Sequence, residues 1–340
     1  MVTIEIQMKV WRAVMANIKK SMTELIGHTP LLELTNIEKK YDLKAELIAK
    51  LEYFNPNQSA KDRIALQIIE DAEEEGKLKK GDTIVETTSG NTGIALAGVA
   101  AAKGYRFDAY LQRQASQERY QTVRALGGNA INNSTVPVVK KALEENDDDF
   151  VAGMVALKQS LRDNDTVFFA DQCFNESNPK AHEKTTGPEI WEDTDGKLDI
   201  VVVAVGTGGT ITGIGRYLKK KNPHIRIVGV QPSKSTIPSK DNPNPVLIQG
   251  IHRVTEIPEE RRSLTLDVAI IDEIYSIEPE EAFETAREVA KEEGILLGQS
   301  SGAAILVARQ LAQKEENAGK RIIALAADTG LRYLSLSLFE

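Results

Sequence analysis

The chain has 340 residues, more than a single hydrophobic core usually spans, so its length predicts two domains with a cleft between them. Hydrophobic residues make up 41% and charged residues 27%, which is typical of a globular protein and excludes a disordered one. The net charge of −8, from 50 acidic and 42 basic residues mixed along the sequence, gives no basic footprint for nucleic acid.

A single cysteine, Cys173, excludes an internal disulfide and favours a reducing compartment, so the predicted location is the cytoplasm. No apolar run approaches the ~20 residues that cross a membrane, and the start of the chain lacks a signal-peptide pattern. The four histidines show no metal-ligand spacing, so no metal is expected. Residues 1–22 are interpreted as an N-terminal extension.

The first segment of chemical interest runs from Asn55 to Arg63. Ser59 is predicted to cap a helix whose apolar positions recur every four residues up to Gly76, which places Lys61 in the first helical turn. A lysine near the positive end of a helix dipole loses its proton more easily, as imine formation requires. Alone this is a weak signal, because most lysines are solvated surface residues.

Short β-branched runs, each followed by a turn and an amphipathic stretch, predict βαβ units. They therefore predict an α/β fold with mostly parallel sheets. A further helix is predicted from Pro279 towards Gly294, with acids in its first turn. Residues 233–262 form the longest irregular stretch, of the kind that builds lids and entrances. The predicted strands are 83–86, 199–205, 226–230 and 321–326.

The turn Thr88-Ser89-Gly90-Asn91-Thr92-Gly93 lies between a predicted strand and a predicted helix. Its hydroxyl and amide side chains, together with free backbone N–H groups, suit a small carboxylate. The alternative is a purely structural capping turn, although caps seldom need so many donors.

A second glycine-rich turn, Gly206-Thr207-Gly208-Gly209-Thr210, follows an apolar run and precedes an amphipathic stretch. Unpaired N–H groups and the helix dipole favour a phosphate at such a position. The turn lacks the Gly-Lys-Ser/Thr of a Walker A loop and the glycine spacing of a dinucleotide site. A tight turn that only packs a helix on a sheet is the alternative.

In this order, the three motifs resemble the tryptophan-synthase-like pyridoxal-phosphate enzymes, and among them the cysteine synthase and cystathionine β-synthase family. The resemblance runs from Leu25-Ile26-Gly27-His28-Thr29-Pro30-Leu31 to Arg332-Tyr333-Leu334-Ser335, which is nearly the whole chain. It also includes the segments Asn178-Pro179, EKTTGPEI at 183–190 and EGIL at 293–296.

The resemblance implies a two-domain, three-layer αβα fold with mostly parallel, twisted sheets, like that of the tryptophan synthase β subunit. Residues 50–167 would form a smaller domain that binds the substrate carboxylate. Residues 23–49 and 168–340 would form a larger domain that binds the phosphate of pyridoxal 5′-phosphate. A homodimer is also implied.

The family's functional residues map onto matching positions. Lys61 would form the Schiff base and remove the substrate α-proton. Asn91 would bond the cofactor's ring oxygen, and Ser300 would contact the pyridine nitrogen. The phosphate would be held by Gly206, Thr207, Gly208, Gly209 and Thr210. The substrate carboxylate would be bound by Thr88, Ser89, Asn91, Thr92 and Gln172.

The implied reaction is β-replacement on an activated L-serine such as O-acetylserine. A neutral hydroxyl such as that of Ser300 does not stabilise a protonated pyridine, so loss of the β-substituent is favoured over a long-lived carbanion. A nucleophile then adds to the resulting α-aminoacrylate. With sulfide as the nucleophile, the product is L-cysteine.

Several positions depart from the family pattern. Gln58 replaces a usual glycine in the lysine loop, which predicts a different loop shape. His252 and Arg253 replace small residues, which resembles the branch that accepts thiosulfate or O-phosphoserine. An exposed arginine on a loop is an equal alternative for Arg253. Arg113 also departs from the usual sequence beside the bound amino acid, so the leaving group and the nucleophile stay open.

Three rival functions remain. The same chemistry with another nucleophile or substrate would give cystathionine, S-sulfocysteine or lanthionine, would use O-phosphoserine, or would release sulfide from cysteine. A non-catalytic relative would be expected to have lost Lys61 or the phosphate turn, and the chain keeps both. A dehydrogenase would leave Lys61 unexplained.

Overall fold

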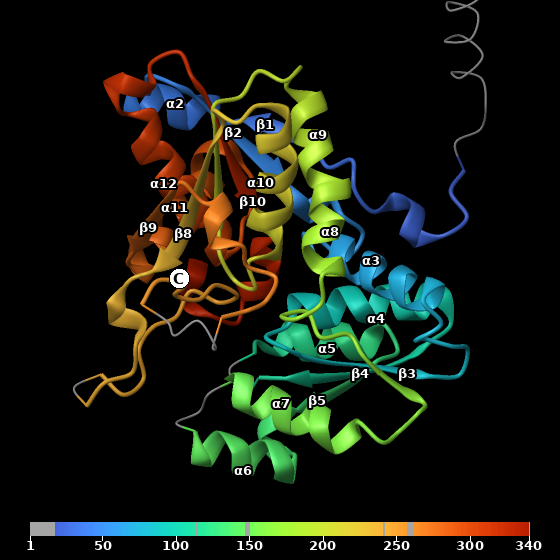
Figure 1. Cartoon of the computed structure of the whole chain (residues 1–340). Coiled ribbons are helices and arrows are strands. Elements are labelled where there is room, and N and C mark those ends of the chain that lie inside the picture. The colour runs from blue at the N-terminus through green and yellow to red at the C-terminus, as the bar shows by residue number, and fades with distance from the viewer. Residues whose placement is uncertain (1–17, 113–114, 147–149, 241, 257–261, 340) are drawn as a thin grey trace, which may run out of the picture.

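Two β-sheets organise the part of the chain that the computed structural model describes, which is residues 18–112, 115–146, 150–240, 242–256 and 262–339. Helices cover both faces of each sheet, and the larger sheet lies above the smaller one in Figure 1. The α/β class with mostly parallel sheets is therefore confirmed.

The larger sheet has six strands. Only its edge strand β1 pairs antiparallel, and the other neighbours pair parallel. β10 has the predicted bounds, while β7 is one residue shorter at each end than the predicted strand 199–205. In spatial order the strands are β1 (Leu31–Glu33), β2 (Glu46–Leu51), β10 (Arg321–Ala326), β7 (Ile200–Ala204), β8 (Arg226–Pro232) and β9 (Glu273–Ile277).

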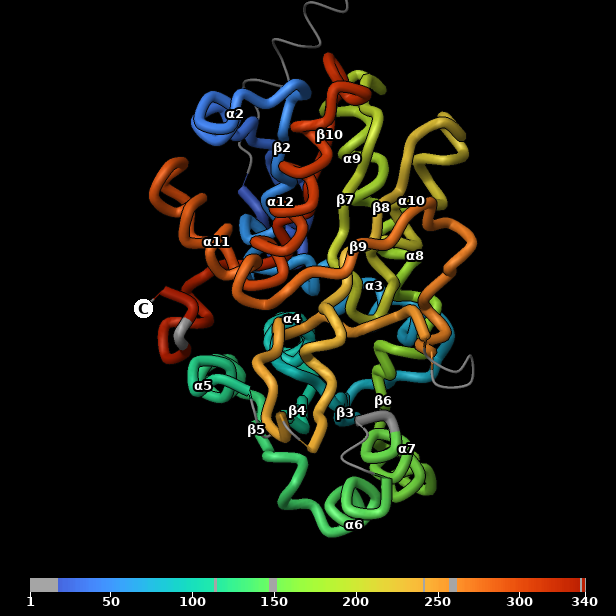
Figure 2. Tube along the Cα trace, turned by 90° about the vertical axis from the view of Figure 1, so that its left-hand side faces the viewer, coloured from blue at the N-terminus to red at the C-terminus, as the bar shows by residue number. Residues whose placement is uncertain are grey.

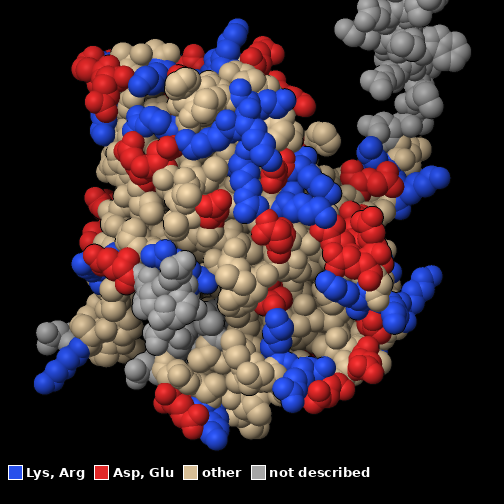
Figure 3. Space-filling view, in the orientation of Figure 1, with Lys and Arg blue, Asp and Glu red and all other residues tan. Residues whose placement is uncertain are grey.

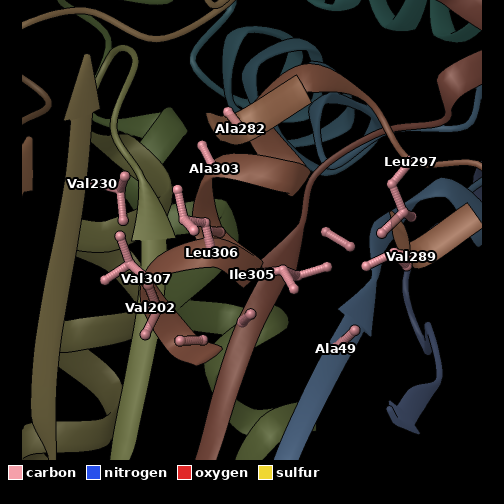
Figure 4. Packing of buried hydrophobic residues seen from close by; sticks show 14 of the residues in the cluster. Ala49, Val202, Val230, Ala282, Val289, Leu297, Ala303, Ile305, Leu306 and Val307 are labelled. Carbon is pink, nitrogen blue, oxygen red and sulfur yellow. The ribbon is translucent and has the colours of Figure 1, made fainter. Parts of the chain in front are cut away.

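Helices α2 (Thr35–Tyr41), α11 (Pro279–Glu293) and α12 (Gln299–Ala312) pack on one face of this sheet. Helices α9 (Thr186–Asp193) and α10 (Gly209–Lys221) pack on the other, and α8 (Ser177–Lys184) packs against α10 and α3. Figure 4 shows the first core, where α12 places its aliphatic side chains against Val202 and Val230 of the sheet. The lack of a side chain at Gly302 lets α11 and α12 approach closely, since a Cβ there would lie 2.2 Å from the carbonyl oxygen of Ala282.

The smaller sheet has four strands, all parallel. Their spatial order is β5 (Asn129–Asn132), β4 (Arg106–Leu111), β3 (Thr83–Thr88) and β6 (Val167–Phe169). One face carries α3 (Lys61–Glu74), α4 (Asn91–Lys103) and α5 (Gln117–Ala125), and the other carries α6 (Pro137–Glu145) and α7 (Phe150–Leu161). Figure 2 shows α6 and α7 at the end of the molecule farthest from the larger sheet.

Short 3₁₀ helices complete the described elements. They are η1 (Met22–Leu25), η2 (Glu52–Phe54), η3 (Asn133–Thr135), η4 (Lys234–Thr236), η6 (Val268–Ile270), η7 (Glu315–Asn317), η8 (Gly330–Tyr333) and η9 (Ser337–Phe339). Among the helices described, none is long and apolar enough to cross a membrane. Acidic and basic side chains are interspersed over the face drawn in Figure 3.

Two sequence predictions about helix ends can be compared with the structure. α11 begins at Pro279 and ends before Gly294, which adopts a left-handed φ of 71°, as predicted. The predicted Ser59 cap is wrong, because α3 begins at Lys61 and its N-cap is Ala60. Ser59 instead pairs with Asp328 in an isolated bridge. The domain boundaries stay a prediction, and most of the predicted extension, residues 1–17, lies outside the described residues.

Candidate functional site

A cavity of about 520 Å³ lies where the C-terminal ends of strands from both sheets meet. Ser89 and Asn91 follow β3, the turn from Val205 to Thr210 follows β7, and Ala327 follows β10; residues from all three segments line it. Ligands of parallel α/β sheets bind at this edge, because the loops and helix N-termini there face outward. The volume lies within the roughly 300–1,000 Å³ of small-molecule sites.

Lys61 lines the cavity from the first position of α3. The loop before it is held to the end of β10, since the N–H of Ala60 donates to the carbonyl of Ala327 at 2.9 Å. The N–H of Lys61 donates to the hydroxyl of Ser59 at 3.3 Å. Gln58 adopts a left-handed φ of 58°, so it takes a conformation that glycine usually supplies. The Gln58 substitution therefore puts a strained residue in this loop, at a cost of about 1–2 kcal/mol.

The ammonium group of Lys61 makes no hydrogen bond or ion pair with any other described residue. Burial lowers the pKa of Lys61, and the nearby carboxylate of Asp328 opposes this shift. A lysine with a lowered pKa more readily supplies a neutral amine, which can act as a nucleophile or a base.

The turn after β3 presents donors to the same cavity. Gly90, with φ of 147°, is the N-cap of α4, and Asn91 and Thr92 form its first turn. Ser89, Asn91 and Thr92 line the cavity. The hydroxyl of Thr88 instead accepts the N–H of Gly90 at 3.0 Å and does not line it.

Gln172 reaches this turn from the loop after β6 and lines the cavity. Its Oε1 accepts the hydroxyl of Thr92 at 2.6 Å, and its N–H donates to Glu86 at 3.0 Å. Glu86 is fully buried. Burial raises its pKa to about 8, although the hydrogen bonds that its carboxylate accepts from two backbone N–H groups lower the pKa. Gln172 is therefore held from two sides, with its amide against the turn of residues 88–93, which we call the carboxylate turn.

The turn after β7 has almost no room for side chains at its glycines. A Cβ on Gly206 would lie 2.3 Å from the carbonyl oxygen of Gly250, and one on Gly208 would lie 2.4 Å from Leu266. Gly208 also has a left-handed φ of 87° and is the N-cap of α10. The first helical bond runs from Thr212 N–H to the Gly208 carbonyl, so the preceding N–H groups have no helical partner. This geometry suits an anion such as phosphate.

Two residues of α8, one turn apart, orient the hydroxyls of this turn. Asn178 donates to the hydroxyl of Thr207 at 3.0 Å, and Nε2 of His182 lies 3.0 Å from the hydroxyl of Thr210. Burial lowers the pKa of His182 to about 3, so its ring is neutral and contributes a hydrogen bond rather than a charge. Gly209 lies against Asn178 and does not line the cavity.

The remaining predicted residues lie at other positions around the cavity. Ser300, in the first turn of α12, lines it, as do His252 and Arg253. The guanidinium of Arg253 donates to the carbonyl of Pro232 at 3.0 Å and pairs with Glu256 at 3.2 Å. Arg253 is thus already engaged, and Arg113 lies outside the described residues.

Two charged residues that the sequence analysis did not single out belong to this region. Arg119 is 2% exposed, lines the cavity, and donates to Gln249 across it. The side chain of Arg119 occupies the space beside Gly90, since a Cβ on Gly90 would lie only 2.1 Å from Cδ of Arg119. Asp328 is fully buried and bonds Asn91 at 2.7 Å. A polar residue two positions after the end of a parallel strand was the signal that could have revealed Asp328.

Comparisons with known proteins agree on one group. The family model described as "Pyridoxal-phosphate dependent enzyme" matches residues 22–328. A cysteine synthase of Staphylococcus aureus is 42% identical over 321 residues, which covers 94% of this chain and 97% of that protein. O-acetyl serine sulfhydrylase isoform 3 from Entamoeba histolytica is 36% identical with a TM-score of 0.82, covering 95% of this chain and 92% of its own. O-ureido-L-serine synthase is 37% identical with a TM-score of 0.79, covering 95% of each chain.

Proposed function

Since the chain belongs to the pyridoxal-phosphate-dependent enzymes and is of the cysteine-synthase type, we propose that it makes L-cysteine from an activated L-serine and sulfide. The reaction is a β-replacement, in which the substituent on the β-carbon of the serine derivative leaves and sulfide adds in its place. O-acetylserine is the substrate we propose, by similarity to the O-acetyl serine sulfhydrylase.

The residues around the cavity fit pyridoxal phosphate. The glycines of the turn from Gly206 to Thr210 leave a cradle that a Cβ would fill, and free N–H groups of α10 face a phosphate placed there. The ammonium group of Lys61, in the same cavity, has no hydrogen-bond or ion-pair partner among the described residues. These features support the assignment of the turn to the phosphate and of Lys61 to covalent attachment.

When bound, pyridoxal phosphate withdraws electrons from the substrate's α-carbon and makes its proton removable. Lys61 then accepts that proton, because burial lowers its pKa and makes the neutral amine accessible. Ser89, Thr92 and Gln172 hold the α-carboxylate, which fixes the α-carbon relative to the amine of Lys61. Ser300, which lines the cavity, would place an uncharged hydroxyl beside the pyridine nitrogen.

The observation that carries the proposal is that Lys61, the carboxylate turn and the phosphate turn line one cavity, although the three segments are far apart in sequence. A relative that shares 42% of its residues over 94% of the chain and is named cysteine synthase supports the product. We further propose a homodimer in the cytoplasm, which size-exclusion chromatography with light scattering and cell fractionation would test.

The absorption spectrum is the first test. The purified protein loaded with cofactor is expected to absorb at ~410 nm, the position of pyridoxal Schiff bases. Lys61→Ala should abolish this band while leaving the circular dichroism unchanged. A wild type that stays colourless with added cofactor would refute the proposal.

Turnover assays should then pair O-acetylserine, O-phosphoserine and serine with sulfide, thiosulfate and homocysteine. We expect the highest kcat/KM for O-acetylserine with sulfide. A faster reaction with another pair would replace the substrate assignment but keep the chemistry, whereas no turnover with any pair would contradict it.

A further inference from the structure

Asp328 occupies the point where three parts of the site meet. It lies two residues after the end of β10, and its backbone pairs with Ser59 in the lysine loop and accepts the N–H of Gly298 at 3.1 Å. Its carboxylate is fully buried. One oxygen accepts the amide of Asn91 and the hydroxyl of Tyr333, both at 2.7 Å. The other oxygen, Oδ1, has no hydrogen-bond partner among the described residues.

The orientation of the Asn91 amide follows from the chemistry of its two neighbours. A carboxylate only accepts hydrogen bonds, so the group of Asn91 that faces Asp328 must be the NH₂. A guanidinium only donates, so the group that Arg332 contacts at 2.5 Å must be the carbonyl oxygen. Asp328 and Arg332 therefore hold the amide from opposite ends, and a rotation by 180° would bring like groups together at both.

The second hydrogen of this NH₂ group is free to donate. Asn91 lines the cavity, and no other acceptor among the described residues bonds its Nδ2. If a ligand in the cavity placed a hydrogen-bond acceptor beside this second hydrogen, both hydrogens of the Asn91 NH₂ group would be paired. A ring oxygen that carries negative charge is such an acceptor. If the Asn91 amide were rotated, its carbonyl oxygen would face this ring oxygen and repel it.

We propose that Asp328 is a positioning residue for the cofactor: it fixes the amide of Asn91 so that the NH₂ group donates to the cofactor's ring oxygen. This inference rests on the proposed function and on the role that the family resemblance implies for Asn91, a hydrogen bond to that oxygen. Asp328 acts through Asn91 and does not itself contact the ring. Arg332 holds the other end of the amide and is itself tied to the lysine loop through the carbonyl of Asn57.

The electrostatic effect of Asp328 on Lys61 is the competing explanation for any defect at this position. Among the charges that raise the pKa of Lys61, the carboxylate of Asp328 has the largest effect. An asparagine at position 328 separates the two explanations, because it removes the charge but keeps an oxygen that can accept from Asn91. Alanine removes both the charge and the acceptor.

The test measures the dissociation constant of pyridoxal phosphate by fluorescence titration of the apoprotein, together with the spectrum of the loaded protein. Asp328→Ala should weaken cofactor binding about ten-fold, the effect of one hydrogen bond to a charged group, and should reduce the ~410 nm band. Asp328→Asn should stay within about three-fold of the wild type. If Asp328→Asn is as defective as Asp328→Ala, the charge carries the effect and the proposal is wrong.

A double-mutant cycle tests whether Asp328 acts through Asn91. Asn91→Ala should itself weaken cofactor binding, and adding Asp328→Ala should then change it less than about two-fold. A full additional loss in the Asn91→Ala background would overturn the proposal, as would an Asn91→Ala variant that binds the cofactor normally.

Two controls complete the design. Tyr333→Phe removes the other donor to the same oxygen of Asp328, and we expect cofactor affinity within about two-fold of the wild type. Circular dichroism of each apoprotein checks the fold, and Asp328→Asn, which preserves the side-chain shape, keeps the proposal testable if Asp328→Ala does not fold. The wild-type ~410 nm band and cysteine formation report separately on the proposed function.

Discussion

Arg63 lies at the centre of a buried charge cluster behind Lys61, and replacing it with methionine tests how this cluster supports the site. Its guanidinium bonds Glu52 at 2.7 and 2.8 Å and Glu189 at 2.6 and 2.7 Å. The side chain of Arg63 is 1% exposed and that of Glu52 is 0% exposed. Lys50 also pairs with Glu189 at 2.9 Å. The cluster joins the first turn of α3 to the end of β2 and to α9.

Arg63→Met should cost about 3–5 kcal/mol of unfolding free energy at pH 7.5, because it leaves buried carboxylates without their main partner. Lys50 remains beside Glu189, so Glu52 is the carboxylate that loses most. Adding Glu52→Gln to the Arg63→Met variant should recover part of the loss, since the buried charge is then removed as well. Cofactor affinity should also fall, because Lys61 lies two residues before Arg63 in the same helix.

The direction of each pKa shift determines how the stability of the wild type and of Arg63→Met changes with pH. Burial alone would raise the pKa of Glu189, but the hydrogen bonds and charge of Arg63 lower it to about 2. Burial would likewise raise the pKa of Glu52, and the charge of Arg63 lowers it. In the wild type these carboxylates therefore stabilise the fold above their ordinary pKa of 4.5, and this contribution is lost as the pH falls towards the folded values. In Arg63→Met burial dominates, so the pKa values lie above the ordinary one and stability falls as the pH rises.

The difference between wild type and Arg63→Met should therefore grow from about pH 4.5 to pH 7.5. Urea unfolding of the apoprotein at both pH values, followed by circular dichroism, measures it. The matched control is Arg162→Met, whose side chain is 70% exposed and which should change stability by less than about 0.5 kcal/mol. Equal stabilities at pH 7.5, or a difference that narrows as the pH rises, would refute the reasoning.

Three further predictions follow from individual contacts. Gly206→Ala should weaken cofactor binding at least about ten-fold in a titration, because its Cβ would lie 2.3 Å from the Gly250 carbonyl, whereas Gly229→Ala, with its nearest contact at 3.3 Å, should bind normally. Arg253→Ala should change the kcat/KM measured with thiosulfate as the second substrate less than about two-fold, because that guanidinium is already bonded to Pro232 and Glu256, and a ten-fold change would contradict this. Burial raises the pKa of Cys173 to about 12, so iodoacetamide should alkylate the native protein at pH 8 less than about a tenth as fast as the urea-unfolded chain.

The features that could be predicted from the sequence are those determined by neighbouring residues. The strand 321–326 and the helix from Pro279 are visible because β-branched runs, proline and glycine act locally. The two turns are equally local, since each packs its donors into five or six consecutive residues. The cavity brings Ser89, Asn91, Thr92, Lys61 and Gln172 together, as the resemblance implied, although their chemical roles stay predictions.

What the sequence did not reveal depends on tertiary contacts. Ser59 is not the cap of α3, because its backbone is paired with Asp328, 269 positions along the chain. The bond between Asn91 and Asp328 joins residues 237 positions apart. Arg119 is buried because Gly90 leaves space for it, and no local pattern predicts that a charged helix residue fills the space beside a distant glycine. The hydroxyl of Thr88 accepts the N–H of Gly90 within the turn, and the role of Thr88 towards the substrate stays a prediction.

The same distinction explains why one half of the reaction is easier to assign than the other. Lys61, the turn 88–93 and the turn 206–210 are the positions that the resemblance assigns to the cofactor and the substrate carboxylate, and each is a contiguous motif. The remaining lining of the cavity comes from two separate segments, with Arg119 on α5 and with Gln249 and His252 on residues 249–254. Arg119 bonds Gln249 across the cavity, and the ring of Tyr333 lies 5.0 Å from its guanidinium. We predict that the selectivity for the second substrate depends on how α5 and residues 249–254 are placed relative to each other, which no single segment determines.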